Sequence, residues 1–121
     1  MDLIFDNNIP IYIQLVEGLK FDIISGKINS GDRLPSVREL ALKIKVNPNT
    51  VQKALAELEN IGLIYTERTN GKFVTEDKRL IKKLKSEYAN DLVSKFVSNM
   101  NDLGINNEEI IDYINKVRGE E

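Results

Sequence analysis

Residues 31–55 read GDRLPSVRELALKIKVNPNTVQKAL, and two helix starts in this stretch decide the fold. Ser36 and Glu39 form a capping-box pattern, in which the serine hydroxyl accepts from the Glu39 N–H and the carboxylate accepts from the Ser36 N–H. Asn47 followed by Pro48 is the second start, with asparagine as N-cap and proline as the first helical residue. A turn of about three residues then separates the two helices, which is the spacing of a helix-turn-helix.

The apolar positions fix which face of each helix is buried. In the first helix they recur at helical spacing, at Val37, Leu40, Ala41 and Ile44. In the second helix they are Val51, Leu55, Leu58 and Ile61, before a stop at Gly62. Lys45 stands in the turn, where many helix-turn-helix proteins have glycine. If the turn needs a positive φ there, the lysine costs on the order of 1 kcal/mol.

The sequence on either side extends this motif into a winged helix. Upstream, Pro10 to Gly26 predicts a helix with one buried stripe, made by Tyr12, Leu15, Val16, Leu19 and Ile23. Downstream, two β-prone runs at 63–66 and 72–75 flank Asn70-Gly71. Asn-Gly is the strongest short hairpin signal, because both residues tolerate positive φ. A helix-turn-helix followed by such a hairpin is a winged helix.

After the wing, the pattern returns to helix. A long helix of about 26 residues, roughly 40 Å, begins near Asp77 and stops at Gly104, and Asn106 with Glu109 caps a final amphipathic helix. A single short partner helix cannot cover the apolar stripe of so long a helix, so we expect a homodimer. The alternative is that the stripe folds back on the winged helix. The predicted dimer interface is Leu84, Tyr88, Leu92, Phe96, Met100, Leu103, Ile110 and Ile114.

These elements predict an α+β fold that is mostly helical. Residues 1–76 form an N-terminal winged helix-turn-helix DNA-binding domain with a two-stranded wing, and residues 77–121 contribute two C-terminal helices as a dimerisation region.

Composition excludes several classes of function. The 121 residues suit one domain, or a small domain with an appendage. Cysteine and histidine are absent, which excludes disulfides, thiolate or imidazole metal sites and His- or Cys-dependent catalysis. We therefore expect no cofactor. The chain has no apolar run of membrane-spanning length and opens with no export signal, so we expect no membrane partner and a bacterial cytoplasmic location, at the nucleoid when bound to DNA.

Charge and its distribution point in different directions. The net charge of −2 speaks mildly against a nucleic-acid binder. From Arg33 to Lys53, however, the sequence has five basic residues and a single acidic residue, Glu39. A second basic run, Lys78 to Lys85, is interpreted as the solvated face of the long helix.

The helix that begins at Asn47 is the predicted recognition helix. Its outward face near the N-terminus carries polar side chains that can reach base edges in a major groove: Asn49, Thr50, Gln52 and Lys53. The backbone N–H groups at this end also favour a phosphate. The alternative is a solvated helix face on which Asn47 is only a cap.

Other candidate contacts surround this helix. Arg38 points outward beside it and suits a phosphate or base, although it could be a solvated arginine. Ser36 is first a cap, with a phosphate contact as a secondary role. Arg33 is equally compatible with a contact to the DNA backbone and with exposure to solvent. The wing tip is basic and narrow and can follow phosphates or enter a minor groove, through Arg68, Asn70, Gly71 and Lys72. The alternative is that Asn-Gly serves only turn geometry.

At these residues the chain resembles the GntR family of bacterial transcription regulators, over roughly residues 10–76. The resemblance rests on Pro10-Ile11-Tyr12, Ser25-Gly26-Lys27-Ile28, Gly31 to Ala41, Asn47 to Leu55, and Gly62-Leu63-Ile64 with Gly71 to Val74. It implies DNA contacts at Arg38, at Asn47, Pro48, Asn49, Thr50 and Gln52, and at Asn70 and Gly71. Many members have arginine where this chain has Pro48, so that arginine contact is lost.

The form Asn-Pro-Asn-Thr-Val-Gln-Lys and the two helices after the wing resemble the YtrA-type subgroup. That resemblance implies a dimer formed by these helices and, often, control of neighbouring transporter operons. The family usually carries a large C-terminal effector domain, for which residues 77–121 leave no room.

We therefore expect a sequence-specific dimeric regulator, a repressor, that binds double-stranded operator DNA with an inverted repeat. To release the regulator from DNA, an unidentified small-molecule effector would have to bind two states of the protein with different affinities. One alternative is a winged-helix protein–protein interaction module, which suits the net acidity. An enzyme is the other, using Asp22, Glu57 and Glu59 or the pair Ser36 and Lys43, but these residues are better explained as caps or helix surface.

Overall fold

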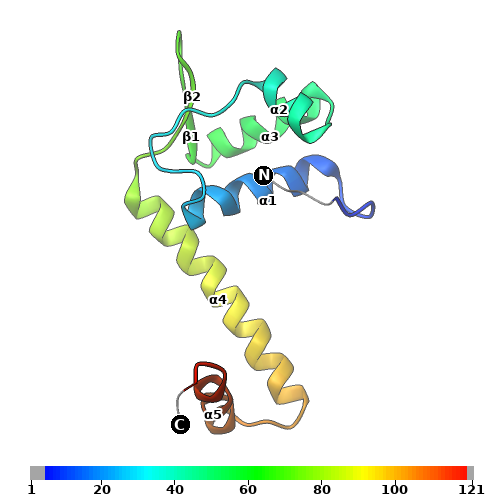
Figure 1. Cartoon of the computed structure of the whole chain (residues 1–121), viewed down its shortest axis with the longest axis vertical. Helices are drawn as coiled ribbons and strands as arrows, with labels where there is room; N and C mark the ends of the chain where they lie inside the picture. The colour runs from blue at the N-terminus through cyan, green and yellow to red at the C-terminus, as the bar shows by residue number, and fades with distance from the viewer. Residues whose placement is uncertain (1–4, 120–121) are drawn as a thin grey trace. The chain divides into compact units, whose positions relative to one another are not determined.

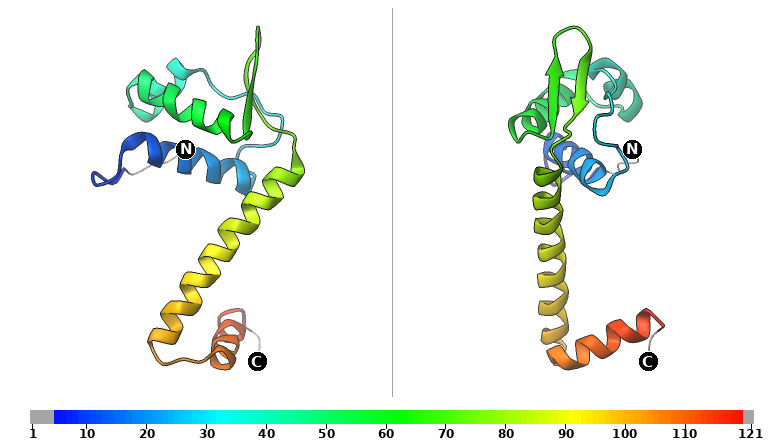
Figure 2. Two further views of the ribbon diagram at one scale, coloured as in Figure 1. Left: turned by 180° about the vertical axis from the view of Figure 1, so that it is seen from behind. Right: turned by 90° about the vertical axis from the view of Figure 1, so that its left-hand side faces the viewer.

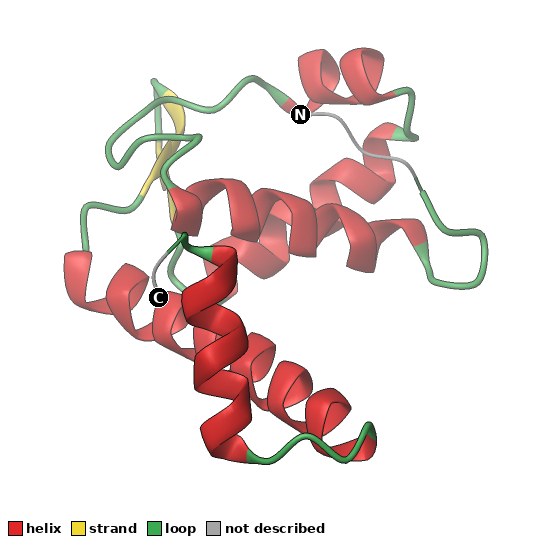
Figure 3. Ribbon diagram, turned by 60° about the horizontal axis from the view of Figure 1, so that its bottom comes forward, coloured by secondary structure: helices red, strands yellow, loops and turns green. Residues whose placement is uncertain are grey.

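The structure, a computed structural model, describes residues 5–119. Its elements, in Figure 1, are α1 (Ile11–Ser25), α2 (Val37–Ile44), α3 (Pro48–Asn60), β1 (Ile64–Glu67), β2 (Gly71–Val74), α4 (Lys78–Asp102) and α5 (Asn107–Val117). The predicted class is confirmed, since helices dominate and a two-stranded antiparallel hairpin is the wing (Figure 3).

The chain divides into two compact units, one up to Lys85 and one from Ser86 onward. The first unit extends past residue 76 because the opening turns of α4 pack on the winged-helix core through Leu80, Ile81 and Leu84. Part of the apolar stripe of α4 is therefore covered within its own unit.

The core of the first unit lies between α1, α2, α3 and the base of the wing. Leu15, Val51, Leu55 and Leu58 have no exposed surface, as the helical spacing predicted. Tyr12 is only half-buried. The buried side chains of the core, besides these four, are Val16, Leu19, Ile23, Leu34, Leu40, Ala41, Ala54, Leu63, Ile64 and Val74.

Both predicted helix starts are confirmed. Ser36 Oγ accepts from the Glu39 N–H at 3.1 Å, and the Glu39 carboxylate accepts from the Ser36 N–H at 3.3 Å. Asn47 Oδ1 accepts from the Asn49 N–H at 2.8 Å, and Pro48 is the first residue of α3. Pro10, by contrast, precedes α1 as its N-cap.

The turn between α2 and α3 does require the left-handed backbone conformation. Lys45 has a φ of 57°, and it is the one non-glycine residue between 5 and 119 with a positive φ. Its N–H and the Val46 N–H both donate to the Ala41 carbonyl, which closes α2. The expected strain at Lys45 is thus present.

The wing differs from its predicted geometry. The strands pair from Ile64 opposite Val74 to Glu67 opposite Gly71, which leaves a loop of residues 68–70. The Asn70 N–H donates to the Glu67 carbonyl at 3.2 Å, and Gly71 follows with a φ of 101°. Asn70 does not use the positive φ that it tolerates, because a longer loop needs this conformation only at the residue after its turn.

A third segment pairs with the free edge of β2, and the sequence did not reveal it. The Leu34 N–H donates to the Lys72 carbonyl and the Val74 N–H to the Asp32 carbonyl, both at 2.8 Å. The Gly31 N–H donates to the Val74 carbonyl at 3.0 Å. We call residues 31–34 the linker strand. This segment follows α1, pairs with β2 and leads towards the start of α2 (Figure 2).

A polar cluster attaches the wing to α3. The Lys72 ammonium lies 3.4 Å from a Glu59 carboxylate oxygen and donates to Thr66 Oγ1 at 2.8 Å, while the Thr66 hydroxyl donates to Glu59. The Thr66 hydrogen bond, and then the Lys72 charge, lower the pKa of Glu59 below its ordinary value.

The second unit contains the rest of α4 and all of α5. Asn106 and Glu109 form the predicted capping box of α5, with N–H to oxygen distances of 2.9 and 3.3 Å. Ile110 is buried in this unit. The other large apolar side chains are mostly exposed, to 66% at Leu92, 75% at Leu103 and 88% at Val117.

Replacing Lys45 by glycine should stabilise the protein. The left-handed conformation costs a side chain about 1–2 kcal/mol, and glycine loses about 0.5–1 kcal/mol of extra backbone entropy on folding. We expect a net gain of up to about 1 kcal/mol in the free energy of unfolding, measured in urea. The control is Lys43→Gly inside α2, which should lose about 0.5–1 kcal/mol. An equal loss of unfolding free energy in both variants would contradict the conclusion that the backbone at Lys45 is strained.

Glu59→Gln should reduce stability at neutral pH by about 0.2–1 kcal/mol, the range of exposed ion pairs. Because the pKa of Glu59 is lower in the folded chain, its contribution is present above the unfolded pKa and is lost as the pH falls through the folded one. Denaturant unfolding of both proteins should give curves that converge in acid. A difference that stays constant down to low pH would show that the carboxylate charge is not involved.

Candidate nucleic-acid interface

The outward face of α3 at its N-terminus is polar and uncharged until Lys53. Asn47, Pro48, Asn49 and Gln52 are exposed, and Thr50 is half-buried, because the opposite face carries the buried Val51 and Leu55. Amide and hydroxyl groups at such a helix end can donate to and accept from base edges in a major groove.

The backbone N–H groups at this helix end, which were predicted to favour a phosphate, are hydrogen-bonded within the chain. Asn47 takes up the available donors: its side chain accepts from the Asn49 N–H, and its carbonyl accepts from the Thr50 and Val51 N–H groups at 3.0 and 3.1 Å. Pro48 has no N–H to offer. The side chains alone are therefore available for recognition here.

Arg38 lies at the second position of α2 and is exposed. Within residues 5–119 the structure gives it no ion pair and no hydrogen bond, so its guanidinium is available to a phosphate or a guanine edge. Ser36, two residues earlier, has its hydroxyl oxygen in the capping box. Arg38 is thus the best-placed cation of the helix-turn-helix.

Lys53 is exposed on α3 but is not isolated. Its ammonium lies 3.8 Å from the centroid of the Tyr12 ring, a cation–π contact that sequence reasoning missed. The contact joins α1 to the outward face of α3. Helical spacing placed Tyr12 on the buried side of α1. Nothing in the sequence indicated that its ring is partly exposed and can contact Lys53.

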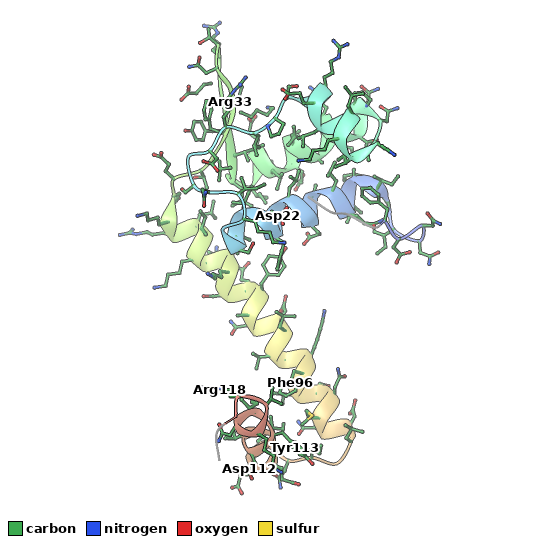
Figure 4. The ribbon with its side chains drawn as sticks, viewed as in Figure 1. Asp22, Arg33, Phe96, Asp112, Tyr113 and Arg118 are labelled. Carbon is green, nitrogen blue, oxygen red and sulfur yellow. The ribbon has the colours of Figure 1, made fainter. Side chains whose placement is uncertain are left out.

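The wing brings together some of the predicted residues and separates others. Arg33, from the linker strand, donates through Nε to the Asn70 carbonyl at 2.8 Å, beside Gly71 (Figure 4). Arg68 is exposed on the loop. Lys72, one residue beyond Gly71, instead pairs with Glu59 of α3.

Sequence reasoning missed Glu59 and Thr66 as partners of Lys72. The observed register places Thr66 directly opposite Lys72 on one face of the hairpin, whereas a two-residue Asn70-Gly71 turn would have paired Lys72 with residue 69. The pairing of Arg33 with Asn70 spans 37 residues and left no local signal.

The arrangement suits a surface that reads a duplex. The hairpin and the α2–α3 pair lie on the same side of α1 (Figure 1) and belong to one compact unit. Among residues 5–119, no cluster of acidic side chains could hold a metal ion, and no helix is long and apolar enough to cross a bilayer.

Comparison with known proteins agrees with this geometry. The profile of the bacterial regulatory proteins of the gntR family matches residues 11–74. The "Uncharacterized HTH-type transcriptional regulator YhcF" of Bacillus subtilis is 36% identical over 114 residues, which is 94% of each chain. The "HTH-type transcriptional repressor YtrA" of the same organism is 35% identical over 109 residues, covering 89% of this chain and 84% of the relative.

Solved structures extend the likeness to the fold. A "GntR family transcriptional regulator from Listeria monocytogenes" superposes with a TM-score of 0.82 at 49% identity, over 93% of this chain and 98% of that one. The DNA-binding domain of AraR in complex with operator ORX1 matches 62% of this chain and 96% of its own, with a TM-score of 0.56 and 29% identity. These relatives are transcription regulators and not enzymes, and the chain belongs to the GntR family of DNA-binding bacterial regulatory proteins.

Proposed function

We propose that the protein is a dimeric transcriptional repressor that binds an inverted-repeat operator through α3, Arg38 and the wing. The observation that carries this proposal is the exposed, unpaired Arg38 beside the polar N-terminus of α3, on the same side of the unit as the wing. Repression follows from occupying promoter DNA, and the name of the YtrA relative, a transcriptional repressor, supports repression over activation.

Within this surface we assign base reading to the side chains of α3. The proposed readers are Asn49, Thr50 and Gln52, with Asn47 and Pro48 setting the start of the helix. Phosphate contacts come from Lys53 and Arg68, which give register without sequence information, and Arg38 contacts a phosphate or a guanine edge. Ser36, Asn70 and Gly71 lie at the edges of this surface, and Lys72 contributes charge while paired with Glu59.

The second unit supports the proposed dimer. It leaves Leu92, Val93 and Phe96 exposed on α4, Leu103 exposed directly after it, and Ile111, Tyr113, Ile114 and Val117 exposed on α5. So many large apolar side chains on so small a unit are typical of an interface. We assign them to a second copy because the YtrA-type resemblance implies a dimer formed by these helices.

The predicted interface residues differ in how far the single chain already covers them. Leu84 packs on the core of its own unit, and Ile110 is buried within its own unit. Tyr88 and Met100 are half-buried, whereas Leu92, Phe96, Leu103 and Ile114 are exposed. The proposed interface is therefore centred on these last four.

A two-fold dimer presents two α3 helices in opposite directions. Its operator is then an inverted repeat, with half-sites one or more helical turns apart. By family resemblance, the regulated genes include a neighbouring transporter operon, and the protein acts in the bacterial cytoplasm on nucleoid DNA. Induction requires a small-molecule effector with different affinities for two states of the dimer.

Arg38→Ala and Gln52→Ala should each weaken binding to the operator by about 1–3 kcal/mol, because each removes a proposed contact at the centre of the surface. The measurement is fluorescence anisotropy at physiological salt, with a duplex carrying an inverted repeat from the protein's own promoter region. Arg79→Ala, at the start of α4, removes the same charge as Arg38→Ala and should change affinity little. Wild-type binding no tighter than to a random duplex would overturn the proposal.

Phe96→Asp should convert the dimer to a monomer, because it places a charge among the exposed apolar side chains. Sedimentation equilibrium should give twice the chain mass of 13.8 kDa for the wild type and the single mass for the variant. Ser94→Asp, on the opposite side of α4, is the matched control and should remain dimeric. A monomeric wild type at micromolar concentration would contradict the assignment.

A further inference from the structure

The tip of the wing is held by one side chain from outside the hairpin. We propose that Arg33 is the positioning residue of the wing: it fixes the loop of residues 68–70 relative to α2 and α3 before DNA binds. We call the contact between Arg33 and Asn70 the wing clamp. Its role in DNA binding rests on the proposed function, but its role in the free protein does not.

The geometry of the wing clamp is specific. Arg33 Nε donates to the Asn70 carbonyl at 2.8 Å. A Cβ at position 71 would lie 3.2 Å from Nε and 3.4 Å from Nη2, so the guanidinium lies against the bare backbone of Gly71. Glycine at this position thus serves both the positive φ of the turn and the approach of the arginine.

Backbone pairing alone does not reach the tip. The last hydrogen bond from the linker strand to the hairpin joins the Leu34 N–H to the Lys72 carbonyl. Beyond it, within residues 5–119, the hairpin has its own pairing, the bonds of Asn70 with Glu67 and the bond from Arg33. Two-stranded hairpins of this length are marginal by themselves. The bond from Arg33 is what ties the loop to the rest of the unit.

The position of Arg33 in the chain gives the wing clamp its functional meaning. Leu34, the next residue, is buried in the core, and Ser36 caps α2 two residues later. The backbone that holds Arg33 is therefore fixed to the helix that carries Arg38. An arginine anchored there fixes the position of the wing tip relative to the start of α3. The wing then loses less conformational entropy when both elements contact DNA.

The wing clamp also brings charge to the tip. A guanidinium has five N–H donors, and the Asn70 carbonyl takes the one on Nε. The remaining donors stay beside Asn70 and Gly71, where a phosphate of the proposed operator would meet them. One residue thus orders the loop and adds a cation to it.

The first test uses the free protein. Amide hydrogen exchange of Asn70, whose N–H donates to Glu67, reports opening of the loop, and the Leu55 amide reports global unfolding. Arg33→Ala should accelerate exchange at Asn70 at least tenfold and leave Leu55 unchanged. Arg68→Ala removes the same charge from the loop itself and should leave both amides unchanged. Equal exchange at Asn70 in the wild type and in Arg33→Ala would overturn the wing clamp.

The second test uses operator DNA and separates positioning from charge. Arg33→Ala should weaken operator binding at least fivefold more than Arg68→Ala, although both lose one charge. Arg33→Lys keeps the charge but lacks Nε, and it should not recover the lost affinity. A lysine variant that binds as tightly as the wild type while Asn70 still exchanges fast would overturn the positioning role. If the wild type fails to prefer the operator, the proposed function fails, and the exchange result still decides the wing clamp.

Discussion

Burial of one face of α3 is the constraint on which the rest of the structure depends. Val51, Ala54, Leu55 and Leu58 have no exposed surface, and every other element of the first unit packs to cover them or their neighbours. Once that face is inside, the helical repeat places Asn49 and Gln52 outside. The proposed recognition surface is therefore a direct consequence of core packing, and a change that rotates α3 should reduce both stability and the proposed DNA binding.

Local signals predicted most of the fold, and non-local contacts account for what they missed. Caps at Ser36, Asn47 and Asn106 act within three residues, so they can be found in one sequence, and the structure has all three. The linker strand cannot be found in this way, because its pairing with β2 joins segments about forty residues apart. For the same reason the contact of Arg33 with Asn70 was not foreseen. That Asn47 alone engages the amide donors of Asn49, Thr50 and Val51 was not foreseen either.

Net charge was a poor guide to this surface, since the chain carries −2 overall. The acidic residues near the candidate interface are largely engaged: Glu39 in a cap, Glu59 with Lys72 and Glu67 with Asn70. Arg38 and Arg68 are exposed beside them. The exposed apolar side chains of the second unit are the proposed dimer interface, which would join two such surfaces so that they bind an inverted repeat.

The central claim is that side chains of α3 read bases, and a double-mutant cycle between protein and operator tests it most directly. Asn49→Ala and Gln52→Ala would each be measured against every base-pair change in one half-site. The account predicts, for each side chain, a coupling of about 1–3 kcal/mol confined to one or two adjacent base pairs. Additive effects at all positions, with no coupling above the error of measurement, would contradict it.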